Sequence, residues 1–271
     1  MGEGTLNRLL RTLSVMILLA SLELYAVACG GGASENPGVE EVDREDLLNP
    51  AAEGEDVLTN LPEVNPPLVA SDPRIVGSQN ITPEEFVQNI GGDLNAKWQA
   101  LFEEAGYAYS NAGFVVYDHP ISIAGCQGIA DPKLGPFYCP ENMTVYYPPS
   151  WRGRSGQTAA EVGDFAVAAI LAHEVGHHVQ YLIGIGQDPN LYTIQRELQG
   201  DCLAGVWARS IYEEGLLERG DVKEAIRVMA NAADLPGTPP KSLRAHGTEA
   251  QRADAFFTGY ESGRGGQCSN F

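Results

Sequence analysis

Apolar side chains recur at helical spacing over residues 86–102 and predict helical structure there. The preceding Thr82-Pro-Glu-Glu85 marks the start, because Thr followed three residues later by Glu forms a capping box and Pro suits the first helical position. Gly91-Gly92 interrupts the pattern, so we expect two helices or one broken helix. The apolar positions are Phe86, Val87, Ile90, Leu94, Trp98, Leu101 and Phe102.

Two aromatic and β-branched stretches, residues 107–117 and 143–147, predict strands. Residues 121–140 between them are rich in Gly and Pro and predict a loop. Longer helical patterns follow, from about Thr158 to Ile183 and from Leu191 to Leu217. Long helices with two short strands predict a mainly helical α+β domain with a small antiparallel sheet.

The sequence HEVGHHVQ occupies residues 173–180, near the end of the first of these long helices. Residues four apart lie on the same helix face, so His173 and His177 can direct two ring nitrogens at one zinc ion. Glu174 can reach a water molecule held at that metal and act as a general base, and Gly176 leaves room for close packing. The alternative is an ordinary buried helix whose histidines form hydrogen bonds with neighbouring residues and bind no metal.

Glu197 follows the motif at a spacing that suits a third ligand. With the turn between the helices centred near Gln187, His177 lies about ten residues before it and Glu197 about ten after, so the two reach the same level in a helical hairpin. Three protein ligands leave a fourth position open, as catalytic zinc requires. Asp201, one turn further on, is expected to accept the ring N–H of a ligand histidine. A solvated Glu and Asp pair is the alternative.

The excess of acidic side chains disfavours a nucleic-acid partner. The chain has 271 residues, with 36 acidic against 17 basic side chains and a formal net charge of −19. We expect no nucleic-acid partner, because few cations are available to neutralise phosphates. Residues 30–80 are acidic, rich in Pro and Asn and poor in aromatics, which predicts a disordered flexible linker before a folded domain at residues 81–271.

The N-terminal residues 1–29 have the features of an export signal. Arg8 and Arg11 precede an apolar run, and the small residues Ala26-Val-Ala28 stand before Cys29. Small residues before a cysteine resemble a bacterial lipoprotein signal, so we expect Cys29 to be lipidated. The protein would then be extracytoplasmic and anchored to the bacterial cell membrane. Cleavage without lipidation and an uncleaved membrane anchor are the alternatives.

Four further cysteines are consistent with an oxidising compartment. Of their three possible pairings we favour Cys126 with Cys139, which flank a Gly-rich loop, and Cys202 with Cys268, which ties the tail to a helix. A second metal site built from cysteines is the alternative, but no Cys-x-x-Cys spacing is present.

Several of these segments together resemble the bacterial putative neutral zinc metallopeptidase family. The resemblance rests on HEVGHHVQ at residues 173–180 and on Glu-Leu-Gln-Gly-Asp-Cys-Leu-Ala-Gly at residues 197–205. It extends to residues 135–140 and 246–252 and covers roughly residues 95–271. The resemblance implies a zincin-like domain in which His173, His177 and Glu197 hold one zinc ion and Glu174 is the catalytic base.

Other polar residues receive less specific interpretations. His246 is a candidate donor to the oxyanion of a tetrahedral intermediate, with Tyr146 and Tyr147 as weaker candidates. His178 points about 100° away from His177 and is expected to be a packing or surface residue rather than a ligand, and His119 is expected to be structural. The strand at 143–147 is expected to form the edge on which an extended substrate pairs, or else to be purely structural.

We therefore expect an exported, membrane-tethered endopeptidase that hydrolyses peptide or protein substrates at one zinc ion. A competing hypothesis is a catalytically silent zinc-binding envelope lipoprotein that serves as a binding or assembly module. A third is a metal-dependent hydrolase of non-peptide amides. A structural zinc would have a fourth protein ligand, whereas a catalytic one leaves that position to water or substrate.

Overall fold

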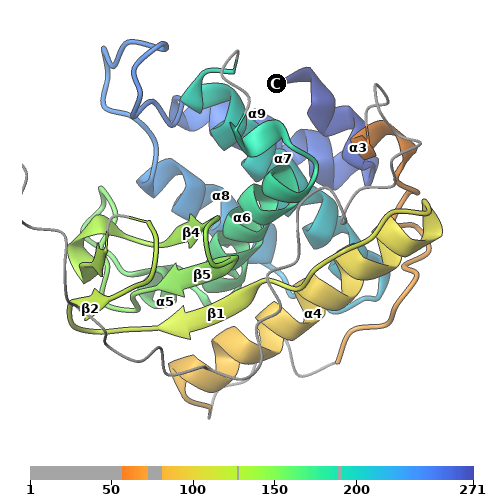
Figure 1. Ribbon diagram of the computed structural model, residues 1–271, viewed down its shortest axis with the longest axis horizontal. Coiled ribbons are helices and arrows are strands. Elements are labelled where there is room, and N and C mark those ends of the chain that lie inside the picture. Colours follow the sequence, from red (N-terminus) through yellow and green to blue (C-terminus); the bar gives the residue numbers. More distant parts are fainter. Residues whose placement is uncertain (1–56, 73–80, 127, 188–190) are drawn as a thin grey trace, which may run out of the picture. The chain divides into compact units, whose positions relative to one another are not determined.

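Helix α6 (Asp164–Leu182) is the centre of the fold in the computed structural model, which describes residues 57–72, 81–126, 128–187 and 191–271 (Figure 1). These residues belong to one compact unit, Val42–Phe271. Cys29 and the predicted export signal lie outside the described residues. Within the described residues, no helix combines the length and hydrophobicity needed to cross a bilayer.

Helix α6 is buried almost all round because it packs against α4, α7, α8 and two strands. The single helix predicted from Thr158 is instead two, α5 (Ala159–Val162) and α6, separated by Gly163. A side chain at Gly163 would collide with the carboxylate of Glu224, at 1.8 Å. Burial raises the pKa of this carboxylate, and the backbone N–H groups of Phe165 and Ala166, in the first turn of α6, face it and lower that pKa, so a side chain of α8 lies at the N-terminus of α6.

Helix α4 (Pro83–Glu104) is continuous, and the predicted break at Gly91-Gly92 is wrong. The capping box at Thr82 is present. Gly91 serves packing, since a Cβ there would lie 2.5 Å from the ring of Phe114.

The main sheet has three strands in the order β1 (Gly113–Val116), β5 (Thr144–Tyr147), β4 (Phe137–Cys139). Strand β1 runs parallel to β5 and β4 antiparallel to it, so the fold is α+β as predicted but the sheet is mixed. Strand β5 lies in the middle, and the prediction that it forms the substrate-pairing edge is wrong. The edges of the sheet are β1 and β4, and β4 is too short to be recognised in a stretch rich in Gly and Pro.

A small second sheet pairs β2 (Ile121–Ser122) with β3 (Ile129–Ala130), also inside the predicted loop. The short 3-10 helix η3 (Pro132–Leu134) follows it. The disulfide Cys126–Cys139 closes this region, as predicted.

The C-terminal half is a bundle of α7 (Thr193–Glu213), α8 (Asp221–Asn231) and α9 (Glu249–Ser262) beside α6, joined to it by η4 (Ile185–Gln187). Helices α7 and α9 approach closely where a Cβ at Gly205 would lie 2.0 Å from the carbonyl oxygen of Phe256. The final segment η5 (Gly265–Asn270) lies against α7, to which the predicted disulfide Cys202–Cys268 ties it.

Part of the predicted flexible linker belongs to the fold. Residues 57–72 include α3 (Val57–Asn60), which packs on η5. Val57, Leu58, Leu61 and Val64 are buried. Val57 and Leu58 lie in α3, and Leu61 and Val64 follow it. These four side chains provide apolar contacts that the acidic composition of the surrounding stretch conceals, so the linker prediction is wrong for this segment. The rest of the predicted linker, residues 30–56 and 73–80, lies outside the described residues.

Candidate metal centre

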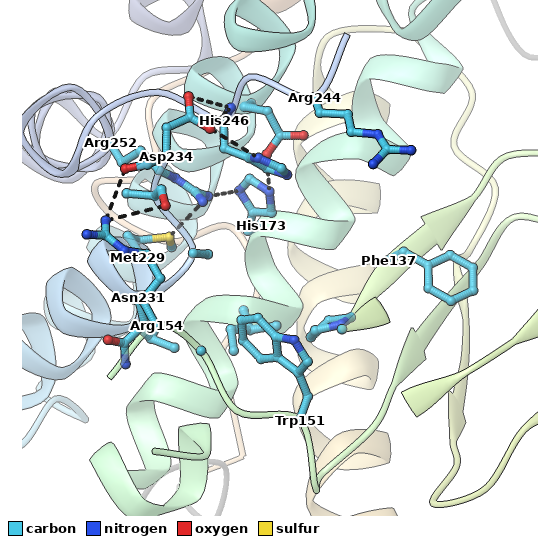
Figure 2. Close-up of a pocket in the computed structure, with 18 of the residues that line it drawn as sticks. Phe137, Trp151, Arg154, His173, Met229, Asn231, Asp234, Arg244, His246 and Arg252 are labelled. Atoms are coloured by element: carbon cyan, nitrogen blue, oxygen red, sulfur yellow. Dashed lines mark hydrogen bonds and ion pairs between the residues drawn. The ribbon is translucent and has the colours of Figure 1, made fainter. Parts of the chain in front are cut away.

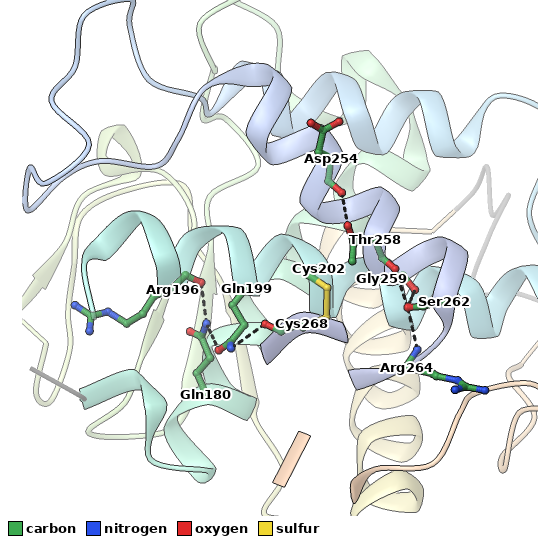
Figure 3. Close-up of a disulfide and its surroundings, with 10 residues drawn as sticks. All are labelled: Gln180, Arg196, Gln199, Cys202, Asp254, Thr258, Gly259, Ser262, Arg264 and Cys268. Atoms are coloured by element: carbon green, nitrogen blue, oxygen red, sulfur yellow. Dashed lines mark hydrogen bonds between the residues drawn. A yellow bond between two sulfur atoms is a disulfide. The ribbon is translucent and has the colours of Figure 1, made fainter. Parts of the chain in front are cut away.

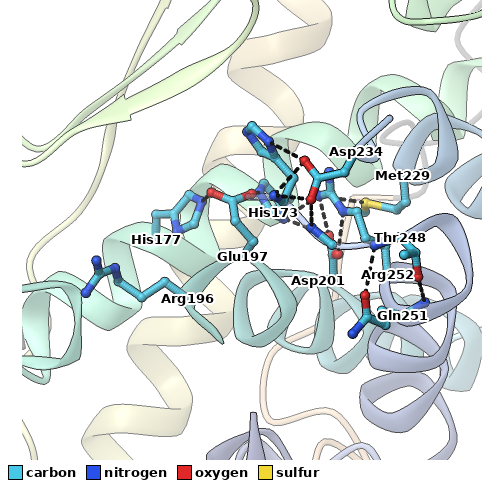
Figure 4. Close-up of polar contacts among 12 residues, drawn as sticks. His173, His177, Arg196, Glu197, Asp201, Met229, Asp234, Thr248, Gln251 and Arg252 are labelled. Carbon is cyan, nitrogen blue, oxygen red and sulfur yellow. Dashed lines mark hydrogen bonds and ion pairs between the residues drawn. The ribbon is translucent and has the colours of Figure 1, made fainter. Parts of the chain in front are cut away.

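Helices α6 and α7 cross at two glycines. A Cβ at Gly176 would lie 2.9 Å from the carbonyl oxygen of Gly200 and 3.0 Å from its Cα. This close approach brings Glu197 of α7 opposite the histidines of α6, as the equal distances from the turn predict (Figure 4).

Three side chains converge at this crossing. The Nε2 atom of His173 is 3.4 Å from Oε2 of Glu197, and Nε2 of His177 is 3.5 Å from Oε1 of the same residue. One ligand atom from each residue lies within 4.8 Å of the other two. Ligand atoms at zinc's usual bond lengths and tetrahedral angles are about 3.3 Å apart. The donor types and their separations therefore fit a zinc ion.

The outer nitrogen of each histidine is engaged, which leaves both Nε2 atoms facing the centre. Nδ1 of His173 lies 2.8 Å from Oδ1 of Asp201, and Nδ1 of His177 lies 2.8 Å from Oε1 of Gln180. Asp201 thus occupies the place foreseen for it beside a ligand histidine. Such partners fix the tautomer and the ring orientation of a metal ligand.

Arg252 of α9 completes this group and was not recognised in the sequence. Its Nε and Nη2 atoms donate to the two carboxylate oxygens of Asp201, each at 2.7 Å. Burial alone would raise the pKa of Asp201, but the charges of Arg252 and His173 outweigh it and hold that pKa below its ordinary value. Asp201 is therefore an anion within the core, shared by a guanidinium and an imidazole.

Without a metal, the carboxylates favour protonated histidines. Burial would lower the pKa of His173, yet Asp201 and Glu197 raise it to about 10. Burial would raise the pKa of Glu197, yet the two histidines hold it well below its ordinary value. A cation that binds all three residues replaces these protons, so binding of the metal releases them.

A cleft of about 990 Å³ opens directly onto the centre (Figure 2). Glu174 lines it, and burial raises the pKa of this carboxyl group. A smaller cavity of about 190 Å³ also adjoins the centre. Both are lined by Tyr138, His177 and Glu197, so each cavity reaches the candidate ligands.

The comparisons with known proteins agree with this geometry. A family model described as putative neutral zinc metallopeptidase matches residues 70–271. The chain belongs to this family. It is 34% identical to uncharacterized protein YpfJ of Escherichia coli strain K12 over 72% of this chain and 75% of YpfJ. It is 29% identical to uncharacterized protein Rv2575 of Mycobacterium tuberculosis strain H37Rv over 67% of this chain and 68% of Rv2575. No solved structure matches.

The other candidate residues of this member of the family lie in different environments. His246 lines the cleft; its ring is half exposed and its Nδ1 lies 3.7 Å from Asp234. Tyr146 and Tyr147 are buried in the two hydrophobic clusters and do not line the cleft. His119 is exposed beside Asp118.

Of the two places expected for His178, in the packed interior or on the surface, the structure shows the interior. It is completely buried, with Nδ1 2.9 Å from the hydroxyl of Tyr138 and Nε2 2.7 Å from the carbonyl oxygen of Ser110. Its ring also makes edge contacts with Tyr109 and Tyr138. It supports the motif helix against the sheet and takes no part in the centre.

Proposed function

We propose that the chain is a zinc-dependent endopeptidase. The observation that carries the proposal is the convergence of His173, His177 and Glu197 beneath a cleft that Glu174 also lines. This donor set, two imidazoles and one carboxylate, is the one that hydrolytic zinc sites use with a fourth position left open. Among the described residues, the group of potential ligands at this crossing contains only these three.

The chemistry is divided between the metal and the chain. When bound, zinc would lower the pKa of a coordinated water to about 7 and polarise a carbonyl group. Glu174 would remove the proton of the attacking water and deliver it to the leaving amine. Burial raises the pKa of Glu174, which makes its carboxylate a stronger base than one in water. His246, on the wall of the cleft, would donate a hydrogen bond to the oxyanion.

The surroundings support cleavage within a peptide chain. The two cavities that reach the ligands leave room for substrate residues before and after the scissile bond. Strand β4 is the last strand of its sheet, and Phe137 and Tyr138 line the large cleft. An extended peptide would pair its backbone with the outer edge of β4.

The decisive experiment compares Glu174→Gln with the wild type. The variant should bind zinc with unchanged stoichiometry and lose cleavage of a peptide library, because Gln cannot accept the proton. Glu104→Gln, an exposed position at the end of α4, is the matched control and should cleave normally. Wild-type cleavage by Glu174→Gln, or cleavage that survives a chelator, would rule out this mechanism. Zinc binding without cleavage by the wild type would favour a silent binding module instead.

We also propose that the chain is an exported lipoprotein anchored through Cys29. The proposal rests on the arginines, apolar run and small residues before Cys29, and two disulfides in the folded part favour an oxidising compartment. Cys29→Ser should move the protein from the membrane fraction to the soluble extracytoplasmic fraction. Equal membrane retention of both forms would contradict lipidation.

A further inference from the structure

A chain of side-chain hydrogen bonds connects His177 to the C-terminal segment (Figure 3). It begins where Nδ1 of His177 meets Oε1 of Gln180, at 2.8 Å. Nε2 of Gln180 donates to Oε1 of Gln199 at 3.0 Å, and Nε2 of Gln199 donates to the carbonyl oxygen of Cys268 at 3.1 Å. Gln180 and Gln199 are 1% and 4% exposed, so water cannot replace these bonds.

The direction of this chain is fixed by two backbone carbonyls, those of Cys268 and Arg196. A backbone carbonyl can only accept, so the carbonyl of Cys268 requires the amide nitrogen of Gln199 and turns its oxygen toward Gln180. Gln180 must then present its own nitrogen, which also donates to the carbonyl oxygen of Arg196 at 2.7 Å. Its oxygen therefore faces His177 and requires a proton on Nδ1. The lone pair of His177 is left on Nε2, at the metal centre.

One of these two carbonyls, that of Cys268, is held by a disulfide. Cys268 is bonded to Cys202, which lies on α7 less than one turn beyond Gln199. The bond holds η5 against the helix that also contributes Glu197. Both glutamines lie in the two motifs, HEVGHHVQ and Glu-Leu-Gln-Gly-Asp, yet no step of the proposed hydrolysis uses them.

We propose that Gln180 and Gln199 are positioning residues for His177, and that the disulfide-bound carbonyl of Cys268 makes the C-terminal segment part of the metal centre. Reduction of Cys202–Cys268 then releases the carbonyl, frees the amide of Gln199 to flip, leaves Gln180 oriented by the carbonyl of Arg196 alone, and lowers the affinity for zinc. The inference rests on the zinc site of the proposed function but not on its catalysis.

The test measures zinc affinity by competition with a chromophoric chelator, together with the absorption spectrum of the Co²⁺ form. Gln199→Met removes both amide bonds at similar size, and we expect a 10- to 100-fold weaker affinity, as for other partners of metal ligands. Gln180→Met should have the same effect. The double variant should lose no more than either single variant, because the chain acts as a unit. Gln199→Glu, of nearly the same shape, keeps the acceptor toward Gln180 but sets an oxygen against the carbonyl of Cys268, and it should also weaken zinc binding.

Two disulfide variants complete the design. Replacement of Cys202 and Cys268 by Ser should weaken zinc binding and make an added Gln199→Met nearly neutral. Replacement of Cys126 and Cys139, the matched control, should leave zinc affinity unchanged. Affinity within twofold of the wild type in Gln199→Met, or additive losses in the double variant, would overturn the inference. Absence of zinc binding in the wild type would instead overturn the metal site itself, and strong zinc binding without peptide cleavage would leave this inference intact.

Discussion

The carboxylate of Asp201 is shared by His173, whose Nδ1 lies 2.8 Å away, and by Arg252, whose two nitrogens lie 2.7 Å away. The side chains of Asp201 and Arg252 are 0% and 2% exposed. Arg252→Met should therefore strand a buried anion and reduce the free energy of unfolding by about 3–5 kcal/mol. Urea denaturation in the presence of a chelator measures this loss without the contribution of bound metal.

The control for Arg252 is Arg264→Met. Arg264 makes a comparable contact with Glu63, with Nη2 at 2.7 Å, but the two side chains are 61% and 36% exposed. Replacement of Arg264 should reduce the free energy of unfolding by less than about 1 kcal/mol, because solvent screens an exposed ion pair. An equal decrease in the free energy of unfolding in both variants would show that burial of Arg252 does not determine its contribution to stability.

The sequence was informative where chemistry depends on spacing along one or two helices. The four-residue spacing of His173 and His177, and the equal distances of His177 and Glu197 from one turn, are properties of helix geometry and could be read directly. The position of Asp201 follows from the same spacing. These inferences required no knowledge of how other elements pack.

Contacts between distant segments could not be obtained in this way. Arg252 is separated from Asp201 by 51 residues and the carbonyl of Cys268 from Gln199 by 69, and no periodicity relates them. The same limit explains the wrong assignments. Strand β4 has only three residues, and Gly91 resembles a helix breaker until Phe114 is seen packed on it.

Two glycine substitutions should have opposite effects. Gly176→Ala places a Cβ 2.9 Å from a backbone oxygen of α7, and backbone cannot turn aside as a flexible side chain can. We expect a loss of about 1–3 kcal/mol in the free energy of unfolding, with weaker zinc binding as α6 and α7 separate. Gly92→Ala in α4 meets no atom within 4 Å and should stabilise the fold by about 0.5–1 kcal/mol. Thermal or urea denaturation of both variants tests this difference, and a Gly176→Ala protein as stable as the wild type would contradict the close crossing.

Acid should destabilise the protein partly through His178. Burial lowers the pKa of this histidine from 6.5 to about 4, so between these values the unfolded chain binds a proton that the folded chain does not. The stabilisation is present above pH 6.5 and is lost as the pH falls toward 4, by about 3 kcal/mol. Denaturation at several pH values in chelator should show this slope in the wild type and a smaller slope in His178→Gln.

Exchange of the exposed His119 for Gln is the control for that experiment. The raised pKa of Glu174 contributes to the pH dependence of stability with the opposite sign at pH values above 4.5. The test is therefore the difference in slope between His178→Gln and the wild type. Identical slopes in these two proteins would show that His178 is not held neutral by burial.

Pairing of the substrate with β4 predicts a period-two response to backbone methylation. In an extended peptide, successive N–H groups point to opposite sides, so only every second one can bond to the outer edge of Phe137–Cys139. A series of substrates, each N-methylated at one position near the scissile bond, should therefore alternate between reduced and normal kcat/KM. Loss of one backbone hydrogen bond, about 0.5–1.5 kcal/mol, corresponds to a roughly two- to tenfold reduction. Methylation far from the scissile bond is the control, and equal sensitivity at consecutive positions would exclude strand pairing.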